Sequence, residues 1–186
     1  MSSSIGTTRR WATAVVGAVL LLGGASAGCA VGKGAPDGWT YLNADGIAIA
    51  VPKAWREIPA ADLPAGVLAA VQLKEHGSVI ADVEVLAKEP PTPKGRKMTV
   101  KPSAPFTLGG HPSRQMNYAF LSTTDGLPRR VTEVTTKAAN GRPVVVLITA
   151  SGKGAGSWVD TMYRIANSIQ IGTIGKGNLV KTWPKV

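Results

Sequence analysis

The chain has 186 residues, with 21 Lys or Arg against 11 Asp or Glu, so its formal net charge is +10. This length suits one domain with its own hydrophobic core, and the excess of cations favours anionic surroundings. A single cysteine excludes a disulfide within the chain, and two histidines with one cysteine give little material for a metal site.

The N-terminal segment has the pattern of a secretory signal. Arg9 and Arg10 form a short cationic region, and the apolar run that follows, residues 11–22, is too short to span a bilayer. Small residues then lead to Cys29. Ser26-Ala27-Gly28-Cys29 resembles the lipobox of bacterial lipoproteins, in which the cysteine receives a diacylglycerol and becomes the new N-terminus. The resemblance implies that residues 1–28 are a lipoprotein signal peptide.

An ordinary secreted protein with Cys29 as a free thiol is the alternative, but an exposed lone thiol outside the cell would be open to oxidation. The arginine pair also fits twin-arginine export, so the choice between that route and Sec stays open. Removing Arg9 and Arg10 with the signal lowers the net charge from +10 to +8. We expect a protein anchored by lipid on the extracytoplasmic face of the cell membrane, where nucleic acid is not a partner.

The segment 29–38 is rich in Gly, Ala and Pro and predicts a flexible tether before a folded domain at 39–172. Strands are predicted at 39–43 and 47–51, a short weak helix at 62–72, and a third strand at 79–86. On that third strand Asp82 and Glu84 share one face. They are spaced as an acidic pair, although a solvated strand face is the favoured interpretation.

The segment 88–105 is predicted to be an exposed loop, because Pro90-Pro91-Thr92-Pro93 cannot join a regular strand ladder. Four of its cations are candidates for contact with anionic lipid or wall polymer, against the plainer interpretation of a solvated loop. They are Lys94, Arg96, Lys97 and Lys101.

The second half of the domain predicts strands at 106–108, 113–121, 129–138 and 144–150, with a two-residue hairpin turn at Asn140-Gly141. The run 144–150 is apolar on both faces and predicts a central strand. Ser157 is expected to cap a helix at 157–168 whose apolar stripe packs on the sheet. That stripe consists of Trp158, Met162, Ile165 and Ile169, and a basic tail follows at 173–186.

This order indicates an α+β fold with a single antiparallel sheet, a packed C-terminal helix and a short second helix. Three patches resemble the PsbP-like superfamily, which includes PsbP, Mog-type Ran-binding proteins and lipoproteins of the LpqN type. They are Gly46 to Trp55 (GIAIAVPKAW), Leu108-Gly109-Gly110 before the strand with Tyr118, and 158–171 (WVDTMYRIANSIQI). The resemblance implies a PsbP-like α-β-α sandwich that binds partners rather than catalysing a reaction.

No HExxH motif or Cys/His cluster occurs, and His76 and His111 are each expected to be solvated loop residues, so no cofactor, metal or catalytic site is expected. We expect a non-enzymatic, monomeric binding or scaffold module of the bacterial cell envelope. Its expected partners are membrane lipid through Cys29 and either an anionic envelope polymer or an envelope protein. Two alternatives stay open: an envelope hydrolase or transferase with an unrecognised site, and a carrier of an apolar ligand with a pocket between sheet and helix.

Overall fold

The computed structural model describes residue 35 and residues 37–172. Cys29, the signal peptide, most of the tether and the tail at 173–186 lie outside the described residues. Within the described part, no helix is long and apolar enough to cross a membrane.

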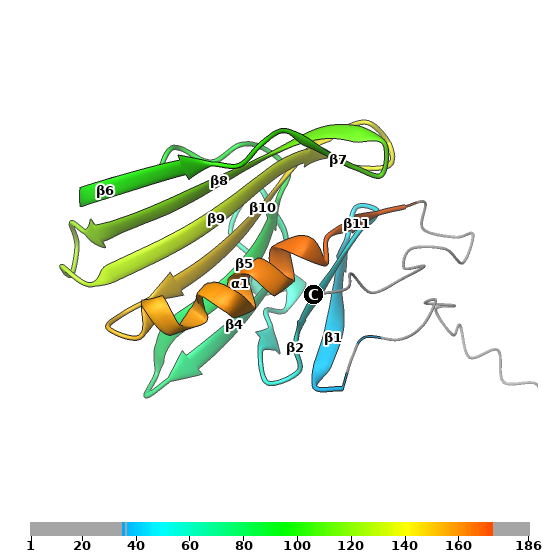
Figure 1. Ribbon diagram of the computed structural model, residues 1–186. Coiled ribbons are helices and arrows are strands. Elements are labelled where there is room, and N and C mark those ends of the chain that lie inside the picture. Colours follow the sequence, from blue (N-terminus) through cyan, green and yellow to red (C-terminus); the bar gives the residue numbers. More distant parts are fainter. Residues whose placement is uncertain (1–34, 36, 173–186) are drawn as a thin grey trace, which may run out of the picture.

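The described chain folds into two antiparallel sheets and one α-helix (Figure 1). The large sheet has the strand order β3-β4-β5-β10-β9-β8-β6, with β7 paired to β8, and the small sheet has the order β1-β2-β11. The strands are β1 Trp39–Ala44, β2 Ile47–Pro52, β3 Arg56–Glu57, β4 Val67–Glu75, β5 Ser78–Leu86, β6 Gly95–Pro102, β7 Phe106–Leu108, β8 His111–Ser122, β9 Pro128–Lys137, β10 Pro143–Ser151 and β11 Gln170–Ile171. The helix α1 spans Val159–Asn167, and short 3-10 turns lie at Ala60–Asp62 and Ala155–Trp158.

The centre of the large sheet is β10, as its sequence predicts. Val144, Val146 and Ile148 are fully buried on the face that carries the core, and Val145 is buried on the opposite face. Because side chains alternate along a strand, a run that is apolar at every position requires cover on both sides. We call the face on which α1 lies the inner face and the opposite face the outer face.

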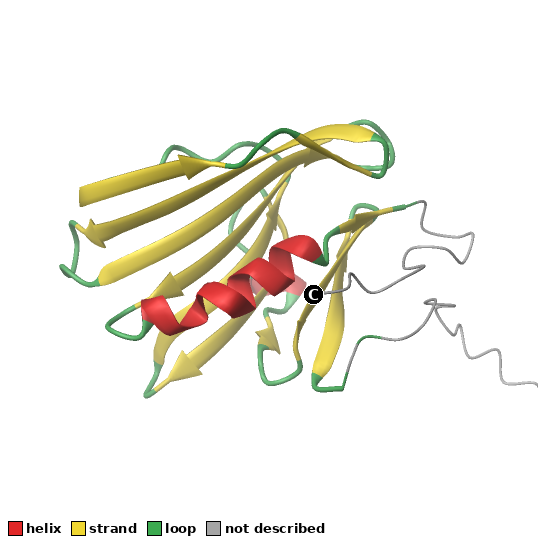
Figure 2. Cartoon of the chain, viewed as in Figure 1, coloured by secondary structure: helices red, strands yellow, loops and turns green. Residues whose placement is uncertain are grey.

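The helix packs on the inner face through the predicted stripe (Figure 2). Met162, Ile165 and Ile169 are buried, and the Trp158 ring meets Trp55 edge-to-face with centroids 5.9 Å apart. Just beyond α1, Ser168 accepts a 2.9 Å hydrogen bond from the Ala50 backbone N–H, which ties the helix end to β2. The predicted Ser157 cap is wrong: Ser157 lies in the 3-10 turn and its hydroxyl donates to the Gly154 carbonyl.

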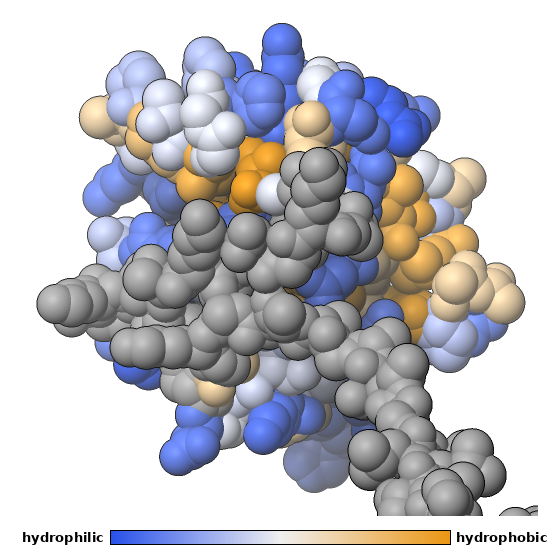
Figure 3. Space-filling model, turned by 90° about the vertical axis from the view of Figure 1, so that its right-hand side faces the viewer, coloured by the Kyte–Doolittle hydropathy of each residue, from blue (hydrophilic) through white to orange (hydrophobic). Residues whose placement is uncertain are grey.

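The expectation of a single sheet is also wrong, because β1 and β2 form a separate sheet with β11. The β1–β2 hairpin closes through a tight turn, with φ of 45° at Asp45 and 80° at Gly46. Ile47, Ile49 and Val51 of β2 are almost fully buried in the core between the two sheets. Seen from the end at β1, hydrophilic side chains predominate at the top and bottom of the surface, and a hydrophobic patch lies on its right-hand side (Figure 3).

The helix predicted at 62–72 is wrong as well. Only a 3-10 turn forms at Ala60–Asp62, and Val67–Glu75 is strand β4. Pro64 and Gly66, whose φ is 89°, break any helix at its start, and pairing with β5 outweighs the weak helix propensity of the remaining residues. In the described residues no helix covers the outer face. The expected α-β-α sandwich is therefore wrong, and only the inner face carries a helix.

The predicted hairpin at Asn140-Gly141 is present between β9 and β10, but its turn differs. The Ala138 N–H donates to the Arg142 carbonyl, which closes a three-residue loop with Gly141 at φ 81°. This is the turn type with a left-handed glycine bulge, and it requires positive φ only at the glycine.

The predicted loop at 88–105 is partly strand. Gly95–Pro102 is β6, an edge strand that pairs with β8 through a bulge at Lys97, where φ is 53°. Three strands separate β5 from β6 in the sheet, so residues 87–94 must cross β10, β9 and β8. Glu89 of this segment forms a 2.7 Å ion pair with Arg114 of β8. Proline therefore shapes an extended crossover rather than a free loop.

Packing of α1 is testable at Ile165, which is fully buried. Ile165→Ala should lower the free energy of unfolding by about 2–5 kcal/mol, because it leaves a cavity between the helix and β10. Tyr163→Ala is the control on the same helix, since its side chain is 60 % exposed, and its effect should stay within about 0.5 kcal/mol. Equal stability losses in denaturant titrations of the two variants would contradict this packing.

Candidate functional site

A hollow of about 350 Å³ opens on the inner face between α1 and the strands β6, β8 and β9. It lies where the sheet extends past the helix, so strand side chains form its floor and helix side chains form one wall. The residues that line the hollow include Lys101, Gln115, Asn117, Arg130, Thr132 and Tyr163. The hollow is the pocket between sheet and helix that an apolar-ligand carrier would need.

The floor of the hollow carries polar side chains that are hydrogen-bonded to one another, although the surface of the hollow as a whole is mostly apolar. The Asn117 Oδ1 accepts from the Thr132 hydroxyl at 2.9 Å and from the Gln115 Nε2 at 3.2 Å, while the Asn117 Nδ2 donates to the Lys101 carbonyl at 3.4 Å. Thr132 is buried, and both amides are half-buried. These bonds fix the orientation of the two amides, so the floor presents a defined set of donors.

The helix wall is apolar. Val159 and Tyr163 lie one turn apart on α1 and are 43 % and 60 % exposed, although both are large hydrophobic side chains. Met162 lies beneath them and is buried. A ligand in the hollow would therefore contact hydrophobic surface on one side and polar groups on the other.

Among the described residues, two cations, Lys101 and Arg130, line the hollow, and no carboxylate does. The ion pairs of the described residues involve Arg114, Arg129 and Arg142 instead. Strands β6, β8, β9 and β10 contain a single carboxylate, Glu133. It pairs across to Met116 and Leu147 on the outer face, away from the hollow. The unpaired cations Lys101 and Arg130 therefore lie on the face of these strands opposite Glu133.

The cations proposed from the sequence divide between two places. Lys94 precedes β6, Lys97 lies in its bulge, and only Lys101 lines the hollow. Arg96 faces the same side as Leu121, on the inner face but beyond the hollow. Sequence reasoning missed Arg130, because an arginine pair in a strand gives no sign of which member faces a cavity. Cys29, the proposed lipidation site, lies outside the described residues.

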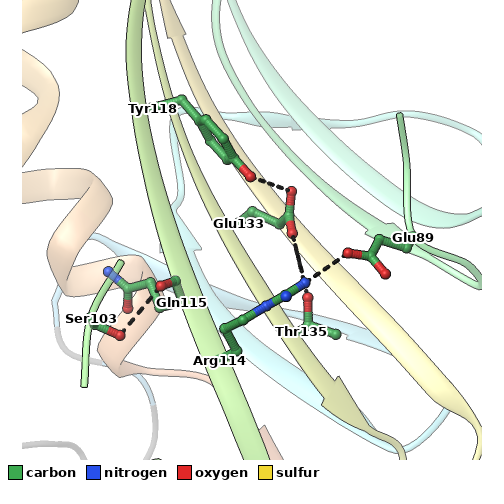
Figure 4. Close-up of polar contacts among 7 residues, drawn as sticks. All are labelled: Glu89, Ser103, Arg114, Gln115, Tyr118, Glu133 and Thr135. Atoms are coloured by element: carbon green, nitrogen blue, oxygen red, sulfur yellow. Dashed lines mark hydrogen bonds and ion pairs between the residues drawn. The ribbon is translucent and has the colours of Figure 1, made fainter. Parts of the chain in front are cut away.

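The outer face holds a second polar cluster around Glu133, which is 3 % exposed (Figure 4). Its carboxylate accepts long hydrogen bonds of 3.5 Å from the Tyr118 and Thr135 hydroxyls and lies 3.9 Å from the Arg114 guanidinium. Burial raises the pKa of Glu133, the Glu89 charge adds to this, and Arg114 opposes it. Because Arg114 forms an ion pair with Glu89 and also lies near Glu133, it connects the crossover segment to the sheet.

The acidic pair on β5 is not a solvated strand face, which corrects the favoured interpretation. Asp82 and Glu84 are half-buried on the outer face. Burial, followed by the nearby Glu84 charge, raises the pKa of Asp82 from 3.8 to about 7, although a Thr149 hydrogen bond and Arg129 oppose the shift. Burial also raises the pKa of Glu84. No group of three His, Cys, Asp or Glu side chains suited to a metal ion occurs in the described residues.

The two histidines occupy strand junctions. His76, with φ 49°, and Gly77 form the exposed β4–β5 turn, as predicted. His111 is half-buried at the first position of β8, not in a solvated loop, because Leu108 pairs with it across the Gly109-Gly110 turn. Neither histidine lines the hollow.

The raised pKa of Asp82 predicts a pH dependence of stability. Because the unfolded chain loses this proton near pH 4 and the folded chain near pH 7, the native state binds more protons between these values, and its stability falls as pH rises through that window. Asp82→Asn should remove this loss, making the variant more stable relative to the parent at pH 8 than at pH 4 by about 2–4 kcal/mol. Equal differences at the two pH values, measured by urea denaturation, would contradict the assignment.

Comparisons with known proteins support the fold. No protein-family model matches the chain, and no curated protein matches it. The solution structure of cyanobacterial PsbP (CyanoP) from Synechocystis sp. PCC 6803 superposes with a TM-score of 0.51 at 12 % identity, covering 76 % of this chain and 96 % of that one. LpqN, involved in cell envelope biogenesis of Mycobacterium tuberculosis, gives a TM-score of 0.42 at 18 % identity, covering 77 % and 89 %. At this identity the CyanoP likeness shows a PsbP-like α+β fold and no activity.

Proposed function

We propose that the protein is a lipoprotein that presents a non-enzymatic binding domain on the extracytoplasmic face of the cell membrane, with the hollow as its binding surface. The observation that carries this proposal is the hollow itself, which combines two unpaired cations, oriented amides and an apolar wall. Such a mixture of apolar surface and few fixed polar groups is typical of ligand sites.

The groups in the hollow support binding over catalysis. Its polar side chains are amides, hydroxyls and cations, whereas acid–base catalysis draws mainly on carboxylates and imidazoles. The raised-pKa acids Asp82 and Glu133 face the outer side of the sheet, so they do not act on a ligand held on the inner side. The apolar wall formed by Val159 and Tyr163 and the mostly apolar surface of the hollow favour a carrier of an apolar ligand as a second candidate.

The anchor is testable at Cys29. Two acyl chains contribute about 0.8 kcal/mol per buried methylene, which gives stable attachment, whereas a single chain would bind only marginally. Cys29→Ser should therefore move the protein from the membrane fraction to the soluble or secreted fraction. Ser26→Ala, which keeps a small residue three positions before the cysteine, should leave it attached. Membrane attachment of Cys29→Ser equal to that of the parent would reject the lipoprotein assignment.

A further inference from the structure

We propose that the hollow binds a linear polyanion of the envelope, a polymer with a phosphate or carboxylate on each repeat, laid along the inner face of β6, β8 and β9. This inference rests on the proposed function and names the class of ligand that the binding surface takes.

Three cations share this face. Arg96 lies opposite Leu121, Arg130 opposite Ala119 and Lys101 opposite Asn117, and directly opposed residues of an antiparallel pair point to the same side. Leu121, Ala119 and Asn117 alternate along β8, so the cations alternate on its two sides. From the usual strand spacing and rise, successive cations have Cα atoms about 12 Å apart. A staggered row of this kind matches repeated charges along an extended chain better than one small ion.

The cations of this row form no ion pair within the described residues. None of the ion pairs in the described residues includes Arg96, Lys101 or Arg130. On the outer face, by contrast, Arg114 pairs with Glu89 and approaches Glu133. A row of unpaired positive groups on this open strip of sheet is complementary to a ligand that supplies negative charge along its length.

The floor adds directional contacts for anionic oxygens. Each amide NH2 group of Gln115 and Asn117 has two hydrogens, and one of them is used within the floor. The second is available to a phosphate or carboxylate oxygen between the cations. The wall at Val159 and Tyr163 confines the chain to the strip of sheet beside the helix.

The test uses the mature chain with Cys29→Ser, so that no lipid contributes, and long-chain polyphosphate as the probe in isothermal titration calorimetry. The site variant is Lys101→Gln with Arg130→Gln. The control is Lys53→Gln with Lys74→Gln, which removes the same charge from two exposed positions outside the hollow. We expect salt-sensitive binding by the parent, about tenfold weaker binding by the site variant, and a change of less than about twofold in the control.

Three results would overturn the inference. Equal weakening in the two variants would show that net charge alone attracts the polymer. Orthophosphate that binds as tightly as the same concentration of phosphate in polymer would show a site for one ion. Absence of polyphosphate binding at low salt would reject the ligand class, and membrane attachment through Cys29 would still stand or fall by its own test. Unchanged melting temperatures in both variants exclude misfolding as the cause.

Discussion

The structure depends on a mismatch in width between one helix and a broad sheet. Helix α1 with its side chains is about 10–12 Å wide, whereas β6 lies three strand spacings, about 14 Å, to one side of β10. The helix packs where the core requires it, over β10 and against β2, with Ile165 at the centre. It cannot also cover β6 and β8. The inner face therefore has a part that the helix buries and a part that stays open, and the hollow lies where the two parts meet.

The two-residue period of the strands then distributes charge between the faces. Arg129 and Arg130 are neighbours in the chain, yet Arg129 faces Asp82 and pairs with Asp125, while Arg130 faces the hollow. On β8 the same alternation sends Arg114 to the acids of the outer face and Gln115 to the floor of the hollow (Figure 4). The outer face is thus stabilised internally by its own ion pairs, whereas the open part of the inner face keeps cations without partners.

Several of these features are readable from the sequence, because they depend on local patterns. The run in β10 that is apolar on both faces predicts a central strand, and the apolar stripe at Met162 and Ile165 predicts a helix packed on the sheet. Both are found as predicted. The β4 segment was predicted wrongly because its alanines and leucines fit a helix, and only the partner strand β5 decides the outcome. The small sheet likewise depends on pairing between β2 and β11, which lie far apart in the chain.

The hollow could not be predicted from local sequence patterns, because it too depends on contacts between distant segments of the chain. Its residues come from β6, β8, β9 and α1, and no spacing in the chain relates Lys101 to Arg130. A proline-rich segment also predicts a loop, whereas the crossover at 87–94 carries the chain to an edge where β6 can pair with β8. The acidic pair was found, but its burial depends on the curvature and neighbours of the whole sheet, which raise the pKa of Asp82.

The central claim, that unpaired cations lie on the open inner face of β6, β8 and β9 while Asp82, Glu84 and Glu133 lie on the outer face, can be tested directly. Paramagnetic relaxation of side-chain amide protons by an anionic and by a cationic nitroxide reports the local potential at each amide. Gln115 and Asn117 report the inner face, and Gln72, opposite Asp82 in the β4–β5 register, reports the outer face. At pH 8 we predict a stronger bias toward the anionic probe at Gln115 and Asn117 than at Gln72. The same bias at all three amides would contradict the account.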